Sequence, residues 1–199
     1  MDCGKLSSRT KVETGIAMKR TTAVLLLVSC MPATILAEVI GAGPGGFSLV
    51  RETTIDASRT EVWAAAIDDV GHWWNGEHSI SGDAMNMSID PTPQGCFCEA
   101  IGDHAGVVHL TVTFVNPTVL LRLTGGLGPL GLMGVNGNMT WEFFDTDDGT
   151  RVRFSYVVGG YQPDGLDSLA EPVDYVVGEA LLRLKAHVET GDASNALIN

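Results

Sequence analysis

The strongest constraint on the fold is a series of short segments in which apolar and polar residues alternate. Alternation with a period of two is typical of β-strands with one buried face and one face toward water. These segments span residues 97–102, 107–115, 119–125, 139–145 and 151–158. The sequence DTDDGT, at 145–150, joins the last two segments as a hairpin. We therefore expect an antiparallel sheet with one apolar, concave face.

The alternation also assigns individual side chains to the two faces of this sheet. The predicted apolar face carries Val108, Leu110, Val112, Phe114, Met139, Trp141, Phe143, Val152, Phe154, Tyr156 and Val158. The predicted wet face carries His109, Thr111, Thr113, Thr140, Glu142, Arg151, Arg153 and Ser155.

The apolar face needs a cover, and a helix predicted at 168–189 provides one. Pro172 lies near its start, a position that proline favours. Its apolar residues recur at helical spacing: Val173, Val177, Ala180, Leu181, Leu184 and Val188.

The sequence before these strands predicts one further strand and two small helices. Residues 47–56 are rich in Thr and Val, as strands are. Ser58 and Glu61 have the spacing of a capping box, which predicts a helix over 58–69 with an apolar face. That face comprises Val62, Trp63, Ala66 and Ile67. A second short helix at 69–75 carries Trp73 and Trp74, and we expect one of them in the core and the other at its edge.

The N-terminal residues 1–37 have the composition of an extension followed by a secretory signal. Met18 is the expected start, a basic pair and an apolar run follow it, and Ala37 offers a cleavage site. We therefore expect export to a periplasm or to the exterior. Alternatives are a lipoprotein, in which Cys30 carries the lipid, and an uncleaved membrane anchor. Either alternative would associate the protein with a membrane.

The stretch VIGAGPGG places Gly41, Gly43 and Gly46 at the spacing of a dinucleotide-binding loop. Such a loop needs a helix directly after it, and no helical pattern begins at Phe47. We therefore interpret residues 38–46 as a flexible Gly/Pro tether. One domain would then span 47–190, and 191–199 would form a flexible tail.

The charge of the chain excludes nucleic acid as a partner. Its 12 Lys and Arg residues face 24 Asp and Glu residues, for a formal charge of −12. Because residues 1–37 carry five basic and two acidic side chains, the remainder has a formal charge of −15. Such a surface repels phosphate backbones and anionic lipids.

Two cysteines, Cys96 and Cys98, lie two residues apart in a predicted strand. Since strand residues at this spacing are about 7 Å apart, a disulfide between them would require a local distortion. We therefore favour two free thiols, with an oxidised pair as the alternative. No further ligands stand at metal-binding spacing, so we expect neither a metal nor a cofactor.

The order of these elements resembles the SRPBCC, or START-like, helix-grip superfamily, in its polyketide cyclase-like and heat-shock-ATPase-activator-like branches. The resemblance covers about residues 48 to 190. It rests on TTIDASRTEVWAAAIDD, GHWWNGE, DPTPQGCFCEA, DDGTRVRFSY and LLRLKAHVE. It implies an α+β helix-grip fold, with a curved antiparallel sheet wrapped around a long C-terminal helix and two short helices after the first strand. This chain departs from the family at Cys96, where a glycine is common.

The resemblance also implies a cavity between sheet and helix, in which family members hold lipids, sterols or polyketides. We expect an exported protein that binds a hydrophobic small molecule there. The alternative is that aromatic side chains fill the space. The side chains expected at the ligand are Trp74, Phe97, Leu110, Phe114, Leu132, Met133, Met139, Trp141, Phe154, Tyr156 and Leu181.

The loop at 124–138 is both glycine-rich and apolar, unlike a solvated linker. We expect it to act as a lid over the cavity. An alternative function is a protein- or membrane-interaction module that uses this loop.

A catalytic version of the same fold, a cyclase- or aromatase-like enzyme, is a further alternative. It would need an acid or base in the cavity, for which Glu99 and Tyr156 are the candidates and His78 is another. His104 and His109 are expected at the surface. Because the sequence contains no Ser-His-Asp arrangement, phosphate loop or metal cluster, we favour a binding protein.

Overall fold

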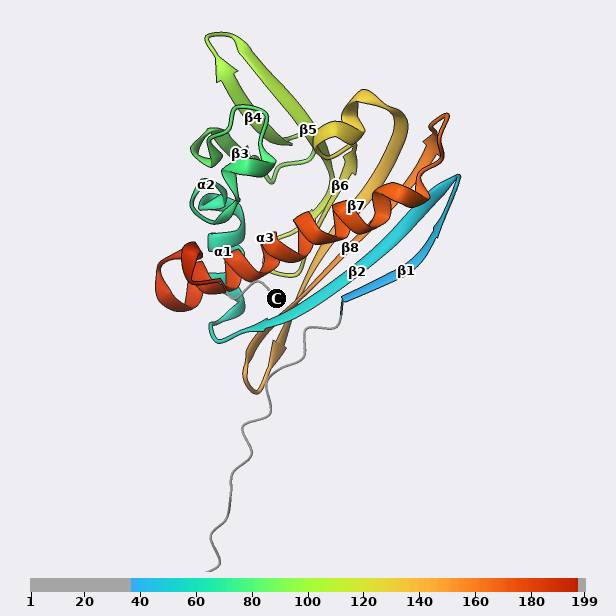
Figure 1. Ribbon diagram of the computed structural model, residues 1–199. Helices are drawn as coiled ribbons and strands as arrows, with labels where there is room; N and C mark the ends of the chain where they lie inside the picture. Colours follow the sequence, from blue (N-terminus) through green and yellow to red (C-terminus); the bar gives the residue numbers. More distant parts are fainter. Residues whose placement is uncertain (1–36, 197–199) are drawn as a thin grey trace, which may run out of the picture. The chain divides into compact units, whose positions relative to one another are not determined.

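The computed structural model describes residues 37–196, which form an antiparallel sheet with a long helix across one face (Figure 1). In this part of the chain eight strands lie in the spatial order β1-β2-β8-β7-β6-β5-β4-β3. They are β1 (Ala37–Gly43), β2 (Gly46–Ile55), β3 (Met87–Ile89), β4 (Cys96–Gly102), β5 (Ala105–Asn116), β6 (Leu120–Gly125), β7 (Gly134–Thr146) and β8 (Gly149–Tyr161). This arrangement confirms the predicted α+β helix-grip class.

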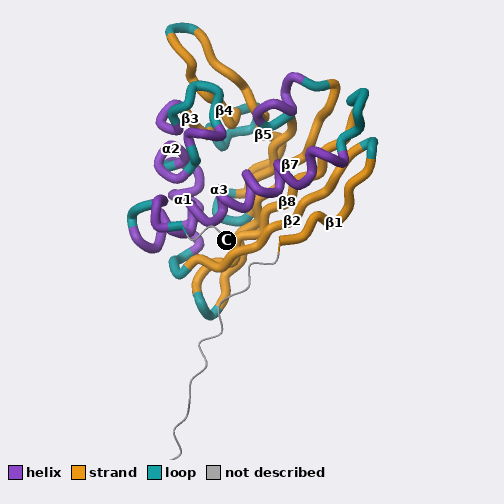
Figure 2. Tube along the Cα trace, viewed as in Figure 1, coloured by secondary structure: helices purple, strands orange, loops and turns teal. Residues whose placement is uncertain are grey.

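The α-helices of the same region are α1 (Arg59–Asp68), α2 (Val70–Trp73) and α3 (Ala170–Thr190). Five short 3₁₀ turns accompany them: η1 (Gly76–His78), η2 (Ala84–Asn86), η3 (Gly128–Leu132), η4 (Asp167–Leu169) and η5 (Ala193–Asn195). Figure 2 shows the helices gathered on one side of the sheet.

Helix α1 begins where the sequence predicts it. The Ser58 hydroxyl accepts a hydrogen bond from the Glu61 N–H, and the Glu61 carboxylate accepts one from the Ser58 N–H. This reciprocal cap satisfies two donors that a helix start otherwise leaves free. Trp73 is buried in the core, and Trp74, which is also buried, lines the cavity described below.

Helix α3 covers the apolar face of the sheet, as predicted. It ends at Gly191, whose φ of 77° lies in the left-handed region that glycine adopts at helix ends. Its buried residues include Val177, Ala180, Leu181 and Leu184. In the described region no helix is long and apolar enough to cross a membrane.

An ion pair joins α3 to β2. The Arg51 guanidinium donates to both carboxylate oxygens of Asp174, at 2.7 and 2.6 Å. The guanidinium lies over Gly178, where an added Cβ would come within 3.0 Å of its central carbon. A glycine at this point of the helix thus makes room for the arginine.

The predicted tether at 38–46 is wrong, because residues 37–43 form strand β1. The chain turns at Pro44 and Gly45, and β1 then pairs antiparallel with β2. The turn itself is anchored, since the Pro44 and Gly45 carbonyls accept hydrogen bonds from the N–H groups of Leu166 and Gly160. The edge of β2 supplies backbone partners that local composition does not reveal. The predicted signal sequence lies outside the described residues, except for its last residue, Ala37.

The predicted flexible tail at 191–199 is also wrong in its first part. Residues 193–195 form the turn η5, with Ala193 buried against the core. The Asp192 side chain caps this turn by accepting a hydrogen bond from the Ser194 N–H. The structure thus continues to Ala196.

Strand β5 contains two bulges that overturn part of the face assignment. His109 is an extra residue opposite the Phe97–Cys98 step of β4, and Thr113 is an extra residue opposite β6. Each extra residue shifts the alternation by one. Val108 and Phe114, predicted to face inward, are therefore 62% and 48% exposed. His109, predicted to be wet, is buried.

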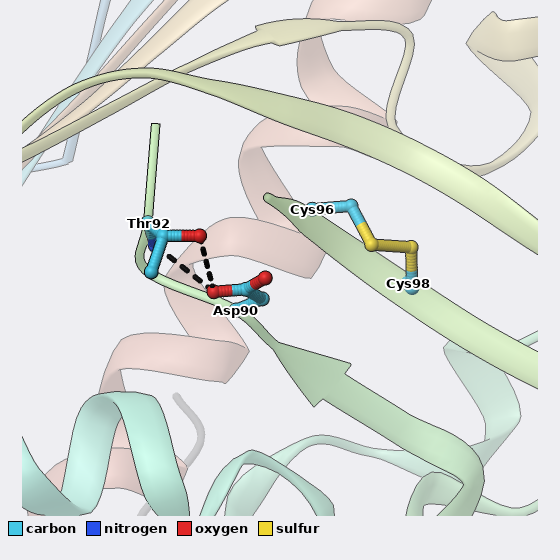
Figure 3. Close-up of a disulfide and its surroundings, with 4 residues drawn as sticks. All are labelled: Asp90, Thr92, Cys96 and Cys98. Atoms are coloured by element: carbon cyan, nitrogen blue, oxygen red, sulfur yellow. Dashed lines mark hydrogen bonds between the residues drawn. A yellow bond between two sulfur atoms is a disulfide. The ribbon is translucent and has the colours of Figure 1, made fainter. Parts of the chain in front are cut away.

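Cys96 and Cys98 form a disulfide in the structure, so the favoured prediction of two free thiols is wrong (Figure 3). Their Cα atoms are 5.4 Å apart, closer than the roughly 7 Å of an undistorted strand. The strand is irregular at this point, because the register of β4 with β5 shifts between Phe97 and Cys98. Beside the disulfide, Asp90 accepts two hydrogen bonds from Thr92 in the turn that follows β3.

Replacing Arg51 by Met should destabilise the fold by about 3 kcal/mol, because it leaves the Asp174 carboxylate without its partner in a largely buried place. Urea unfolding, followed by tryptophan fluorescence, measures the change. The matched control is Arg153→Met, which breaks solvated cross-strand pairs with Glu52 and Glu142 and should cost less than about 1 kcal/mol. Equal losses in the two variants would contradict a special role for the Arg51 ion pair.

Candidate functional site

The middle of the space between sheet and helix is filled by side chains. Trp141 packs edge-on against Phe154, with ring centroids 5.1 Å apart, and its ring is tilted against that of Trp73, with centroids 6.0 Å apart. The gap that remains beside them measures about 10 Å³, room for about one water molecule. It is lined by Trp74, Phe97, Leu127, Met139, Trp141, Phe154, Val177 and Ala180. The predicted cavity is therefore closed at its centre.

A larger cavity of about 380 Å³ lies at one end of this space, beside the first turns of α3. Three segments form its walls: the start of α3, the connection after α2, and the loop between β6 and β7. The lining residues are Trp74, Glu77, His78, Ser79, Ile80, Leu127, Gly128, Pro129, Leu130, Leu132, Met133, Leu169, Pro172, Val173 and Val176. Most of these side chains are apolar.

The glycine-rich loop forms one wall of this cavity. It is shorter than predicted, since β6 extends to Gly125 and β7 begins at Gly134. Leu127 and Leu130 are buried within it, whereas Leu132 at its tip is 92% exposed. The loop therefore has a packed base and an uncovered apolar tip.

The base of the loop is held by Tyr156, one of the two predicted catalytic candidates. Its hydroxyl donates to the Gly125 carbonyl at 3.0 Å and accepts from the Leu127 N–H at 3.1 Å. Burial raises the pKa of this phenol, although the hydrogen bond from Leu127 opposes the rise. The side chain is fully buried, so its observed role is to fix the loop.

Glu99, the other predicted catalytic candidate, ties two walls of the cavity together. Its carboxylate accepts hydrogen bonds from the N–H groups of Ile80 and Ser81, and from Nε2 of His109 at 3.0 Å. The other ring nitrogen, Nδ1 of His109, accepts from the N–H of Gly128 at 3.3 Å. The imidazole is therefore the neutral tautomer with its proton on Nε2. A continuous chain of hydrogen bonds runs from Ile80 to the loop.

The pKa of Glu99 reflects this arrangement. Burial alone raises the pKa of a carboxyl group. Here the hydrogen bonds from Ser81, Ile80 and His109 outweigh burial and lower the pKa from 4.5 to about 2. The group is thus a carboxylate at neutral pH and its oxygens are occupied, an arrangement that favours a structural role.

A second pair of a carboxylate and an imidazole, Glu179 and His78, lies at the cavity wall. His78 was a candidate from the sequence, whereas Glu179 was not. Glu179 of α3 is only 5% exposed. One carboxylate oxygen accepts from the Asn75 amide at 2.7 Å, and the other is 2.7 Å from Nε2 of His78. Because Glu179 stands beside apolar residues of α3, helical spacing gives no sign that it meets residues 104 and 101 positions earlier.

The structure distributes the predicted ligand-binding residues over four places. Trp74, Leu132 and Met133 line the larger cavity. Phe97, Met139, Trp141 and Phe154 surround the small central gap. Leu110, Tyr156 and Leu181 are buried in the core, and Phe114 lies exposed after the second bulge of β5. The lining residues Leu169, at the end of η4, and Pro172, Val173 and Val176 of α3 were not among the predicted ligand-binding residues.

The fold is shared with solved structures that are distant in sequence. EF2215, a conserved protein of unknown function from Enterococcus faecalis, aligns with a TM-score of 0.57 at 16% identity, over 82% of each chain. MLL2253 from Mesorhizobium loti aligns with a TM-score of 0.53 at 19% identity, over 73% of this chain and 98% of its own. DynU16, described as a protein in the dynemicin biosynthetic locus, gives 0.52 at 18% identity, over 74% of this chain and 49% of its own.

These similarities establish the fold and nothing finer. No protein-family model matches the chain, and no curated protein matches it in sequence.

Glu99 should make stability depend on pH in the acid range. Its folded pKa of about 2 lies below the ordinary value of 4.5. The stabilisation is therefore complete above pH 4.5 and is lost as pH falls toward 2. Replacing Glu99 by Gln should flatten this part of the stability curve and cost about 1.5–3 kcal/mol at pH 7. Urea unfolding at several pH values measures both effects.

The control for this experiment is Glu171→Gln, at an exposed glutamate in the first turn of α3. It should keep the acid dependence and cost less than about 1 kcal/mol. An unchanged acid dependence in Glu99→Gln would show that the hydrogen bonds to Glu99 do not hold its charge.

Proposed function

We propose that this protein binds a small hydrophobic molecule in the cavity beside the start of α3. The observation that carries the proposal is an apolar space of about 380 Å³ next to a core that is otherwise filled. Ligand sites commonly measure about 300–1,000 Å³ and combine apolar walls with a few polar groups. This cavity has both properties.

The loop between β6 and β7 supports the proposal as a lid. Its base is held by Tyr156 and His109 through the N–H groups of Leu127 and Gly128. Within the described residues, these side chains form no hydrogen bond with the tip at Leu132, which carries an exposed apolar side chain. A loop with a fixed base and a free apolar tip is suited to closing over an apolar ligand.

The helix-grip resemblance supports a lipid-like or polyketide-like ligand. Members of that superfamily hold such molecules between sheet and helix. DynU16, which shares the fold, is described as belonging to the dynemicin biosynthetic locus. This makes a polyketide-like aromatic molecule a reasonable first class to test.

We also propose that the chain is exported. The proposal rests on the basic pair, apolar run and Ala37 of the N-terminal sequence. Cleavage after Ala37 would leave nearly all of β1 in the mature protein, since β1 spans Ala37–Gly43.

Expression of the full chain in a Gram-negative host tests export. Mass spectrometry of the periplasmic fraction should find a product that begins at Glu38. A lipidated product beginning at Cys30 would favour the lipoprotein instead. Recovery of only uncleaved protein from the cytoplasm would contradict export.

Binding can be tested with N-phenyl-1-naphthylamine, a neutral dye whose emission rises in apolar surroundings. The wild-type protein should bind the dye, and Val173→Trp should weaken binding at least tenfold, because a larger side chain on that wall fills the space. Val157→Trp, on the exposed outer side of β8, is the matched control and should bind as the wild type does. Equal binding by both variants would place the dye elsewhere, and no binding by the wild type would contradict the proposal.

A further inference from the structure

One corner of the cavity is polar, and we call the group of Asn75, His78 and Glu179 the polar corner. Of its members, His78 lines the cavity. Glu179 lies behind it, almost fully buried, and holds Nε2 of the His78 ring at 2.7 Å. Asn75 holds the other oxygen of Glu179 at 2.7 Å. The arrangement is a histidine oriented by a buried carboxylate.

The backbone around His78 is fixed as firmly as its side chain. The Asn75 side chain caps η1 by accepting a hydrogen bond from the Glu77 N–H at 3.0 Å. The His78 carbonyl accepts a hydrogen bond from the indole N–H of Trp74. Asn75 therefore positions both the turn that carries His78 and the carboxylate that orients its ring. Such double support is what keeps a binding group in one geometry.

One atom of the polar corner, Nδ1 of His78, has no hydrogen-bond partner in the part of the chain that the structure describes. Both oxygens of Glu179 are occupied, one by Asn75 and one by Nε2 of His78. Since a carboxylate only accepts, Nε2 of His78 carries a proton, and in the neutral form of the imidazole Nδ1 is then an acceptor. Within residues 37–196 no group donates a hydrogen bond to Nδ1 of His78.

The other polar residues at the cavity are less suited to contact a ligand. The Ser79 hydroxyl already donates to the Gly76 carbonyl at 2.8 Å. Glu77 is an exposed residue, so water competes for its carboxylate. The remaining lining side chains are apolar, so His78 is the group at which a polar ligand atom would be recognised.

We propose that Nδ1 of His78, oriented by Glu179, accepts a hydrogen bond from a hydroxyl group of the ligand. The ligand class would then be an apolar molecule with an acidic hydroxyl, as in a phenol or an enol. This inference rests on the proposed binding function and adds the polar contact that selects among hydrophobic molecules. A site that offers a hydrogen bond to a hydroxyl discriminates against an analogue that lacks the hydroxyl.

Charge argues against an anionic ligand at this corner. Glu179 lies directly behind His78, and Glu77, an exposed residue, lines the same cavity. The whole chain carries a formal charge of −12. These negative charges repel a ligand carboxylate and leave a neutral hydroxyl unaffected.

The test compares naphthalene with 2-naphthol, which differ by one hydroxyl. The wild-type protein should bind 2-naphthol about fivefold to tenfold more tightly than naphthalene, the gain of one hydrogen bond. His78→Phe should retain naphthalene binding and lose the preference. The matched control is His104→Asn, at an exposed turn residue with a φ of 57°, a conformation that Asn tolerates. It should keep the preference.

A second readout uses the excited state of 2-naphthol, in which the hydroxyl becomes strongly acidic. Beside an acceptor, the proton moves from the naphthol oxygen to Nδ1, and the bound probe emits as naphtholate. In His78→Phe the bound probe should emit as neutral naphthol. Glu179→Gln should reduce naphtholate emission while naphthalene still binds, because Glu179 acts as a positioning residue through His78. A purely packing role for Glu179 would change the affinity for both probes alike.

The outcomes separate the two proposals. If neither probe binds to the wild-type protein, the cavity does not hold hydrophobic molecules of this size and the binding function fails. If both bind with equal affinity, and naphtholate emission is the same in wild type and His78→Phe, the binding function stands and the role of His78 is overturned. Naphthalene binding by each variant also verifies that the variant is folded.

Discussion

The position of helix α3 across the apolar face of the sheet determines where this protein has space. The bidentate ion pair of Arg51 with Asp174 joins the helix to β2, and the hydrogen bonds of Glu179 with Asn75 and His78 join it to the segment after α2. At the centre of the space, the aromatic side chains Trp141 and Phe154 surround a small gap together with two residues of the helix, Val177 and Ala180. Because the aromatic side chains fill the centre, free volume remains at the first turns of α3. The glycine-rich loop forms one wall at that end. The cavity thus exists because side chains fill the centre of the core but not the end beside the start of α3.

Two pairs of a buried glutamate and a histidine lie in or behind the walls of this cavity, and their hydrogen bonds give them different roles. In the Glu99 and His109 pair every ring nitrogen is used, since Gly128 donates to Nδ1. This pair ties the segment at Ile80 to the loop and is structural. In the Glu179 and His78 pair the second ring nitrogen has no partner in the described region. The same two residue types therefore build the frame of the site in one place and its proposed recognition group in another.

Much of the fold was predictable because its signals are local. The capping box at Ser58, the hairpin turn at 145–150 and the spacing of α3 each depend on residues close in sequence. The site was less predictable. Trp74, Leu132 and Met133 were expected at the ligand and do line the cavity. The alternation of residues assigned Phe114 to the wrong face, because a bulge in β5 shifts the alternation there. Glu179 was missed because its partners lie more than 100 residues away.

The sequence by itself determined the class of fold, since the order of alternating strands and one long amphipathic helix allows few ways to bury apolar surface. It also determined the acidic charge and the composition of the loop. Only the tertiary structure decided which part of the space between sheet and helix stays open and which carboxylates accept hydrogen bonds. It also decided that residues 37–43 pair with strand β2. These outcomes depend on side-chain volumes and backbone partners brought together from distant segments. Local sequence patterns carry no information about contacts between such distant segments.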